Sequence, residues 1–242
     1  MRRLTILLAL AACAAPAHAA QPTSMPTANC DEHEAVVDGD AAAVAARLPA
    51  EFTPVTDYDG SPLIVAHAIR CARVDLGDHS GPATFANIGV MIQSPDGVGC
   101  ASGAPVVGAV KGDVPSSCNW YSLAWWSDDC HVAKWTDGSR TPIAFSLGES
   151  TFHADVPDTF AIDDGFHMYP GTISVRGAYW TTAERLGISS DTIDAGIATG
   201  TLTAESPEIE ALLGAPQRSF VLGYNSVAAV HWDALTYERR SR

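Results

Sequence analysis

The sequence predicts a mainly-β fold, a single antiparallel β-barrel or sandwich with about three short helices. Most of the chain divides into short segments in which apolar and polar residues alternate, bounded by Gly, Pro, Asn and Asp. Helix signatures are few and brief. No repeat or linker divides residues 41–242, so we expect one β domain there, preceded by an N-terminal arm at 20–40.

The first residues have the three parts of a secretory leader. Met1-Arg2-Arg3 is positively charged, Leu4 to Ala12 is apolar, and Ala17-His18-Ala19 offers small residues for cleavage. The apolar run is too short for a permanent membrane anchor. We therefore expect residues 1–19 to be a signal peptide and the protein to be periplasmic or secreted.

A second interpretation of the leader stays open. Leu10-Ala11-Ala12-Cys13 has the form of a bacterial lipobox, in which Cys13 is acylated and becomes the mature N-terminus. Residues 14–29 would then be a polar tether, and the protein would be lipid-anchored through Cys13.

Local signals predict the elements in chain order. Asp40 caps a helix over 41–48. Ser127-Asp128-Asp129 provides an N-cap and acids for a second helix, which Gly138 follows, and Ser206-Pro207 opens a third. Strands are expected at 62–74, 85–93, 119–126, 172–180, 197–203 and 219–230. The segment 62–74 is apolar on both faces through Ile69, which is typical of a central strand.

The charge balance limits the possible partners. The chain has a formal net charge of −14, and Arg239-Arg240 and Arg242 read as a frayed C-terminal tail. Nucleic acids and anionic membranes require clustered Lys and Arg, so no nucleic-acid partner is expected, and no membrane partner unless Cys13 is lipidated. A small-molecule ligand or substrate is the expected partner. We predict no cofactor and no metal, and the oligomeric state stays open.

The cysteines beyond the leader are expected to pair, as in other exported proteins. Cys100 and Cys118 bracket a Gly/Ala/Val/Pro-rich stretch, so a bridge there would contribute about 3 kcal/mol by the loop-entropy model. Cys30 and Cys71 would tie the N-terminal arm to a strand, although four of the five cysteines can pair in fifteen ways and the connectivity stays open. Cys130 lies in an expected helix and is predicted to be the unpaired thiol.

The order of several segments is informative. They are Leu48-Pro49-Ala50-Glu51-Phe52-Thr53-Pro54, the strands at 62–74 and 83–94, the turn Ser94-Pro95-Asp96-Gly97, and Tyr121-Ser122-Leu123-Ala124-Trp125-Trp126-Ser127-Asp128-Asp129 before a helix. This order resembles the acetoacetate-decarboxylase-like β-barrel superfamily over most of the mature chain. Enzymes of that superfamily use a Schiff-base lysine beside a second lysine. This chain has no adjacent lysines, so the resemblance does not carry that chemistry over.

Other signatures of catalysis are weak. Lys111 stands in a Lys-Gly-Asp sequence typical of a turn, and Lys134 belongs to a short helix among acids. Gly148-Glu149-Ser150-Thr151-Phe152 lacks the second glycine of a nucleophile elbow. The segment Asp31-Glu32-His33-Glu34 is rich in ligand types, but its place beside the leader favours a solvated arm.

Four residues are the candidates for catalysis. His153 and Asp155 are two residues apart, so on a strand they point to the same face, and His167 follows on a nearby segment. If these segments pair, the three side chains converge as an acid/base pair requires. Arg176 lies on an alternating strand and would pair with Asp155 or with a substrate carboxylate.

The tryptophans suggest a binding site. By alternation, Trp120 and Trp126 share one face of a strand, and Trp125 lies on the other with Tyr121 and Leu123. One face packs in the core, and Trp125 or Trp126 lines a cavity. We expect an exported barrel that binds a small, largely apolar or aromatic molecule. The alternative is a secreted lyase or hydrolase that acts on a small organic acid or ester in the same cavity.

Overall fold

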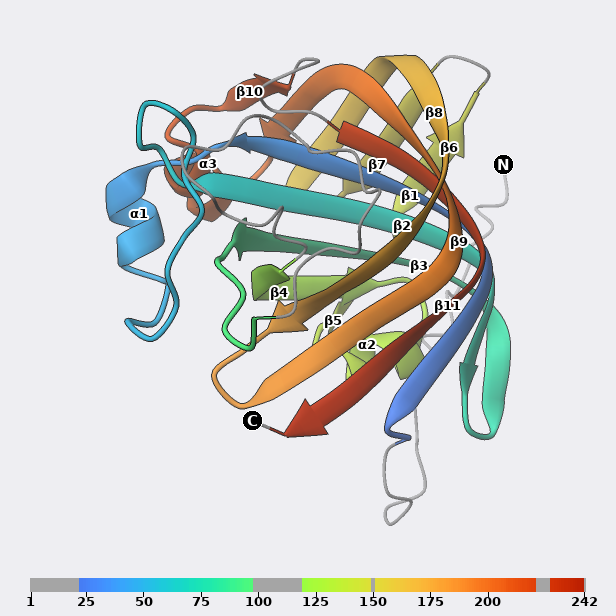
Figure 1. Ribbon diagram of the computed structural model, residues 1–242. Coiled ribbons are helices and arrows are strands. Elements are labelled where there is room, and N and C mark those ends of the chain that lie inside the picture. Colours follow the sequence, from blue (N-terminus) through green and yellow to red (C-terminus); the bar gives the residue numbers. More distant parts are fainter. Residues whose placement is uncertain (1–21, 98–118, 149–150, 221–226, 242) are drawn as a thin grey trace, which may run out of the picture.

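The computed structural model describes residues 22–97, 119–148, 151–220 and 227–241, and for 166–176, 190–197 and 227–235 it describes the backbone alone. The elements are β1 (Ser24–Asp38), α1 (Ala41–Ala45), β2 (Leu63–Leu76), β3 (His79–Met91), β4 (Asn119–Ser127), α2 (Cys130–Trp135), β5 (Ser139–Arg140), β6 (Ala144–Leu147), β7 (Phe152–Val156), β8 (Phe160–Trp180), β9 (Glu184–Ala204), α3 (Pro207–Leu213), β10 (Gln217–Phe220) and β11 (Val227–Ser241) (Figure 1). The prediction of a mainly-β fold with three short helices is confirmed. In this part of the chain, no helix is long and apolar enough to cross a membrane.

Seven strands close into a barrel in the order β9, β11, β1, β2, β3, β4 and β8, because β8 also pairs with β9. Neighbours in this ring are antiparallel except β4 and β8, whose residues 119–121 and 178–180 pair in parallel. The chain between these two strands forms α2 and β5 to β7, the kind of crossover that parallel neighbours require. The barrel is therefore mixed, not purely antiparallel as predicted.

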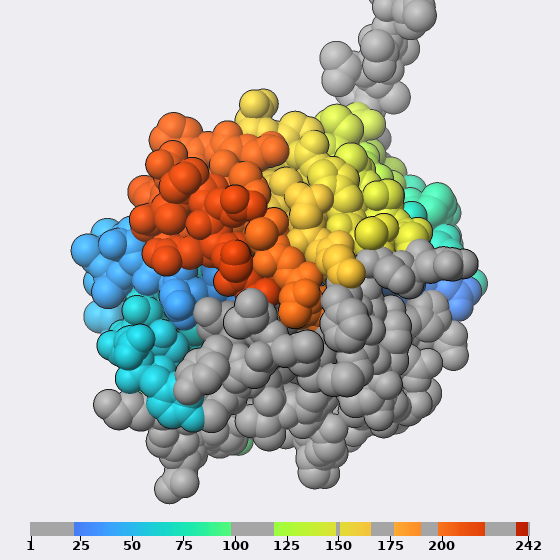
Figure 2. Space-filling model, turned by 90° about the horizontal axis from the view of Figure 1, so that it is seen from above, coloured from blue at the N-terminus to red at the C-terminus, as the bar shows by residue number. Residues whose placement is uncertain are grey.

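Both faces of β1, β2 and β3 are largely buried, so the molecule has two apolar cores. The helix-covered core contains residues of α1, α3, β7 and the start of β8. The aromatic core contains residues of α2 and rings from several strands: Phe85, Trp120, Trp125, Tyr179 and Tyr237. β8 and β9, at 21 residues each, curve around the molecule (Figure 1). Seen from above, α1 lies beside the α3–β10 segment on one flank (Figure 2).

β1 occupies the stretch that was predicted to be a solvated arm. Residues 24–38 pair with β11 on one side and with β2 on the other. Ala35 and Val37 belong to the helix-covered core, whereas Glu32 and Glu34 share their face with Val36 of the aromatic core. The arm prediction is wrong for these residues, because pairing on both sides buries His33 and half-buries Asp31, Glu32 and Glu34, a run of charges that by itself resembles a surface segment.

The C-terminal residues also belong to the barrel. β11 pairs with β9 as far as Ser241. Arg239 forms an ion pair with Glu184 at 3.2 Å and lies 5.0 Å from the centre of the Trp135 ring. The prediction of a frayed tail is therefore wrong for Arg239 and Arg240.

The cysteines agree in part with the predictions. Cys30 and Cys71 form the predicted disulfide, between residues that face each other on β1 and β2. Cys130 is also disulfide-bonded, so the prediction that it is a free thiol is wrong. It is the first residue of α2 and half-buried, so its place in a helix does not prevent it from pairing. Cys100 and Cys118 lie outside the described residues, as do Cys13 and the leader.

Candidate active site

Two acids and an imidazole from adjacent strands meet in the aromatic core. Glu32 and Glu34 are two residues apart on β1 and share a face, and His67 on β2 lies opposite Glu34 in the strand register. The Nδ1 atom of His67 is 2.6 Å from Oε1 of Glu32, which is a hydrogen bond. We call Glu32, Glu34 and His67 the acid–imidazole cluster.

Aromatic rings from several strands surround this cluster. His67 is 1% exposed, and its ring lies 5.0 Å from the ring of Trp120 on β4 and 5.5 Å from that of Tyr179 on β8. Phe85 on β3 and Tyr237 on β11 meet at 5.9 Å. Neither β2 and β8 nor β3 and β11 are neighbours in the sheet, so these rings meet across the barrel.

Three buried polar atoms near the cluster have no hydrogen-bond partner in the described structure. They are Nε2 of His67, Nε1 of Trp120 and Oδ1 of Asn87. Asn87 on β3 lies opposite His67, so Glu34, His67 and Asn87 form a polar row across three strands that are otherwise apolar here. An unsatisfied buried group costs about 1–3 kcal/mol. A bound polar molecule would remove that cost, which makes this row a candidate site.

Burial and mutual charge set the protonation of the cluster. Burial raises the pKa of Glu34 from 4.5 to about 7, with a contribution from Glu32, although His67 acts in the opposite direction. Burial alone would lower the pKa of His67, but Glu34 and the hydrogen bond with Glu32 outweigh it and raise that pKa above 6.5. Burial also raises the pKa of Tyr179 and Tyr237, so both phenols stay protonated. Near neutral pH, Glu34 can therefore both accept and release a proton.

A β-bulge decides which tryptophans belong to this site. Ile88 and Gly89 of β3 pair with Ala124 and Ser122 of β4, so Leu123 is an extra residue that reverses the alternation beyond it. Trp120 and Trp125 consequently share the aromatic core, and Trp126 lies on the other face. The prediction that Trp120 and Trp126 share a face is wrong for this reason.

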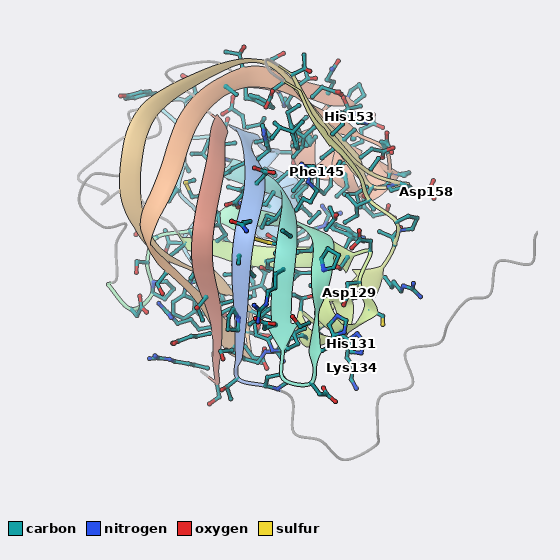
Figure 3. All side chains as sticks on the ribbon, turned by 90° about the vertical axis from the view of Figure 1, so that its right-hand side faces the viewer. Asp129, His131, Lys134, Phe145, His153 and Asp158 are labelled. Atoms are coloured by element: carbon teal, nitrogen blue, oxygen red, sulfur yellow. A yellow bond between two sulfur atoms is a disulfide. The ribbon has the colours of Figure 1, made fainter. Side chains whose placement is uncertain are left out.

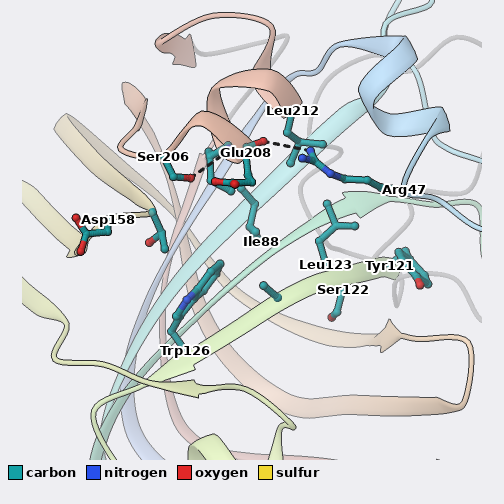
Figure 4. A pocket seen from close by; sticks show the side chains of 13 residues that line it. Arg47, Ile88, Tyr121, Ser122, Leu123, Trp126, Asp158, Ser206, Glu208 and Leu212 are labelled. Atoms are coloured by element: carbon teal, nitrogen blue, oxygen red, sulfur yellow. Dashed lines mark hydrogen bonds between the residues drawn. The ribbon is translucent and has the colours of Figure 1, made fainter.

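Trp126 lines a separate pocket of about 540 Å³ between β4 and the helices α1 and α3 (Figure 4). Arg47 from the end of α1 and Glu208 of α3 lie at its polar side, where the Arg47 guanidinium donates to the Glu208 carbonyl oxygen at 3.2 Å. The apolar side is formed mainly by Ile88, Tyr121, Leu123, Trp126 and Leu212. Ligand binding at Trp125 and at Trp126 stays a prediction, now at two different places.

The residues predicted for catalysis lie elsewhere. His153 on β7 is 2.7 Å from Asp163 on β8, and their side chains are 43% and 55% exposed. Asp155 is half-buried and hydrogen-bonds with Glu205, whose pKa is raised by burial and by Asp155. His167 and Arg176 lie in β8, where only the backbone is described. The convergence of these four side chains stays a prediction. Figure 3 shows His153 at one end of the molecule, far from Asp129 and His131 near the other.

A second buried imidazole has a different setting. His33 on β1 hydrogen-bonds through Nδ1 to Asp164 of β8 at 2.7 Å and stacks on the Phe152 ring at 3.3 Å. It joins β1 to the β7–β8 hairpin within the helix-covered core, and we assign it a structural role.

The prediction from the sequence missed Glu32, Glu34 and His67. A signal was present, because His67 is an ionisable residue inside a strand that is apolar on both faces. The spacing of Glu32 and Glu34 would place both on one face of a strand, but the charges around them favoured an arm. The lysine in the described part of the chain, Lys134, lies exposed on α2 away from the cluster.

Comparisons with known proteins agree with the resemblance stated above. No family profile matches the sequence, and no curated protein matches it either. Among solved structures, acetoacetate decarboxylase from Legionella pneumophila is similar at 11% identity and a TM-score of 0.49, covering 95% of this chain and 92% of that one. An acetoacetate decarboxylase-like enzyme from Sphingomonas wittichii RW1 is similar at 11% identity and a TM-score of 0.48, covering 91% and 93%. The enduracididine biosynthesis enzyme MppR, complexed with pyruvate, is similar at 11% identity and 0.47, covering 93% and 91%. The first two of these structures carry the name of the superfamily that the sequence resembles, and the barrel itself rests on the strand pairings above.

Proposed function

We propose that this protein binds a small, largely apolar or aromatic molecule in the aromatic core, with an oxygen atom of that molecule at the acid–imidazole cluster. The observation that carries the proposal is the pair of orphaned groups on His67 and Trp120, whose rings are in contact. An indole N–H only donates, and a protonated imidazole whose Nδ1–H is bonded to Glu32 donates through Nε2. Two donors on adjacent rings suit a carbonyl or carboxylate oxygen.

Binding of acetophenone tests this proposal. We expect its affinity, measured by calorimetry, to fall about threefold to tenfold in Trp120→Phe and in His67→Leu, the loss of one hydrogen bond. Ethylbenzene, which lacks the oxygen, should bind wild type and Trp120→Phe equally. His153→Ala is the matched control, because that imidazole also bonds to a carboxylate but is exposed. Acetophenone affinities that are the same in all four proteins would contradict the proposal.

Proton transfer is the second candidate function, and the pKa of Glu34 near 7 favours it. With a carbonyl oxygen on the two donors, the Glu34 carboxylate would take a proton from the adjacent carbon. The electron pair of the broken C–H bond then forms a carbon–carbon double bond, and the π pair of the carbonyl moves to its oxygen, where the donors stabilise the negative charge. The resulting enolate is the first intermediate of a lysine-independent lyase that acts on a small oxo acid or ester.

Hydrogen–deuterium exchange at the methyl group of acetophenone measures this step directly. We expect catalysed exchange in D₂O, followed by NMR, to rise with an apparent pKa of about 7 and to be lost in Glu34→Gln. Exchange that persists at the wild-type rate in Glu34→Gln would refute the assignment and leave a binding function.

We also propose that the protein is exported, on the strength of residues 1–19. The intact mass of the secreted product should correspond to a chain that begins near Ala20. If the lipobox is used, it should correspond to a chain that begins at Cys13 and carries a diacylglyceryl group there. A full-length product that stays in the cytoplasm would contradict both alternatives.

A further inference from the structure

Two imidazoles and a carboxylate meet at the end of the barrel next to α2. His79 is the first residue of β3, just after the turn that joins it to β2, and Asp129 and His131 flank the first residue of α2. One ligand atom of each side chain lies within 4.8 Å of the other two. Figure 3 shows Asp129 and His131 at this end, remote from His153. Segments far apart in the sequence thus bring three metal-ligating groups together.

The geometry of the three groups is close to that of a ligand set. Nε2 of His79 is 3.0 Å from Oδ2 of Asp129, and Nδ1 of His131 is 3.7 Å from Oδ1. The two imidazole rings stack face to face, with centroids 3.8 Å apart. Ligand atoms on a tetrahedral zinc ion lie roughly 3.3 Å apart, given Zn–N bonds of about 2.0 Å. The ligand atoms are thus near the required separation, and the two stacked rings must turn apart to direct both lone pairs at one ion.

Asp129 is held in place before any ion binds. Its Oδ1 atom accepts hydrogen bonds from the backbone N–H groups of His131 and Val132, at 2.8 and 3.0 Å, and so caps α2. α2 is in turn anchored by the buried side chains of Val132 and Trp135, and the Trp135 indole donates to the Pro22 carbonyl oxygen at 2.8 Å. A carboxylate fixed by such outer contacts is a better metal ligand than a mobile one.

We propose that His79, Asp129 and His131 form a binding site for a divalent first-row transition metal ion of the zinc class. Imidazole nitrogens select these ions over Mg²⁺ and Ca²⁺, which prefer an all-oxygen set. The side chains of His79, Asp129 and His131 are 25%, 16% and 44% exposed, so the site is open to solvent and water completes the coordination. The ion would join the β2–β3 turn to α2 across the end of the barrel. This site is independent of the acid–imidazole cluster.

Zinc titration of the metal-stripped, untagged protein tests the site. By calorimetry we expect one equivalent of Zn²⁺ to bind. Bound Co²⁺ should give the visible absorption that is typical of a low coordination number. His79→Ala and His131→Ala should each weaken Zn²⁺ binding by at least about tenfold. His79 pairs with the other oxygen of Asp129, so its replacement leaves the cap hydrogen bonds from His131 and Val132 in place.

His153→Ala is the matched control, because His153 and Asp163 form an ion pair of similar length and, among the described side chains, belong to no group of three metal ligands. It should bind one equivalent of Zn²⁺ with wild-type affinity. Zinc binding that is absent in the wild type, or equal in His79→Ala, His131→Ala and wild type, would overturn the proposal and leave a histidine–aspartate ion pair. Binding that is lost only in His153→Ala would overturn it equally.

Discussion

Replacing Glu34 with Gln should stabilise the protein at pH 8 and leave its stability near pH 4 almost unchanged. The pKa of Glu34 is about 7 in the folded protein, because burial raises it from 4.5. At a pH between 4.5 and 7, Glu34 holds a proton in the folded protein that it has released in the unfolded chain. The free energy of unfolding therefore falls as the pH rises from 4.5 through 7. Below pH 4.5, Glu34 is protonated in both the folded and the unfolded state. Above pH 7 it is ionised in both, and the folded state is destabilised by the full cost of the half-buried charge.

The size of the effect follows from the two pKa values. One pKa unit corresponds to about 1.4 kcal/mol, so the rise from 4.5 to about 7 costs roughly 3 kcal/mol at pH 8. Gln has the shape of Glu but does not ionise, so the variant avoids this cost. His67 acts in the same direction in the wild type: its pKa is raised despite burial, and the stability that it adds below pH 6.5 is lost at higher pH.

Urea unfolding, followed by tryptophan fluorescence at pH 4.5, 6, 7 and 8, measures the difference. The two proteins should have similar stability at the lowest pH and separate by about 3 kcal/mol at pH 8. Glu210→Gln, on the exposed side of α3, is the control and should show no divergence of this size. If Glu34→Gln is no more stable than wild type at pH 8, Glu34 is not a buried near-neutral acid, and its proposed role in proton transfer fails as well.

Three further predictions concern the scaffold, and urea unfolding tests each of them. Serine at both Cys30 and Cys71 should lower the free energy of unfolding by about 4 kcal/mol, because the bridge joins residues 41 apart; an equal stability of the double variant and the oxidised wild type would contradict this. Alanine at Gly200 should cost about 1–3 kcal/mol, because its Cβ would overlap the Asp163 carbonyl oxygen and the Phe220 ring, whereas alanine at Gly165, where there is open space, should cost less. Asp40→Ala should cost about 1 kcal/mol by removing the cap on Ala43 N–H, and Asp40→Asn should retain most of that stability.

The sequence by itself determined the local elements. Asp40 and Ser206 accept hydrogen bonds from the N–H groups of Ala43 and Ile209, as their position before the helices predicts. The alternating segment at 119–126 is β4, and the both-face apolar segment at 62–74 is β2. These features depend on residues within one turn or along one strand, so the sequence contains the whole signal. The bridge between Cys30 and Cys71 was also predicted, as one of fifteen possible ways to pair four of the five cysteines.

Only the tertiary structure decided which side chains form the site. Alternation predicts that Glu32 and Glu34 share a face, but the pairing of β1 with β2 and β11 determines that this face turns to the aromatic core. The extra residue at Leu123 exchanges Trp125 and Trp126 between the two cores, and it can be recognised only from the partner strand. The parallel contact of β4 with β8 closes the barrel around His67. Each of these depends on strands distant in the sequence, and pairing across such distances is a property of the whole chain, not of any segment.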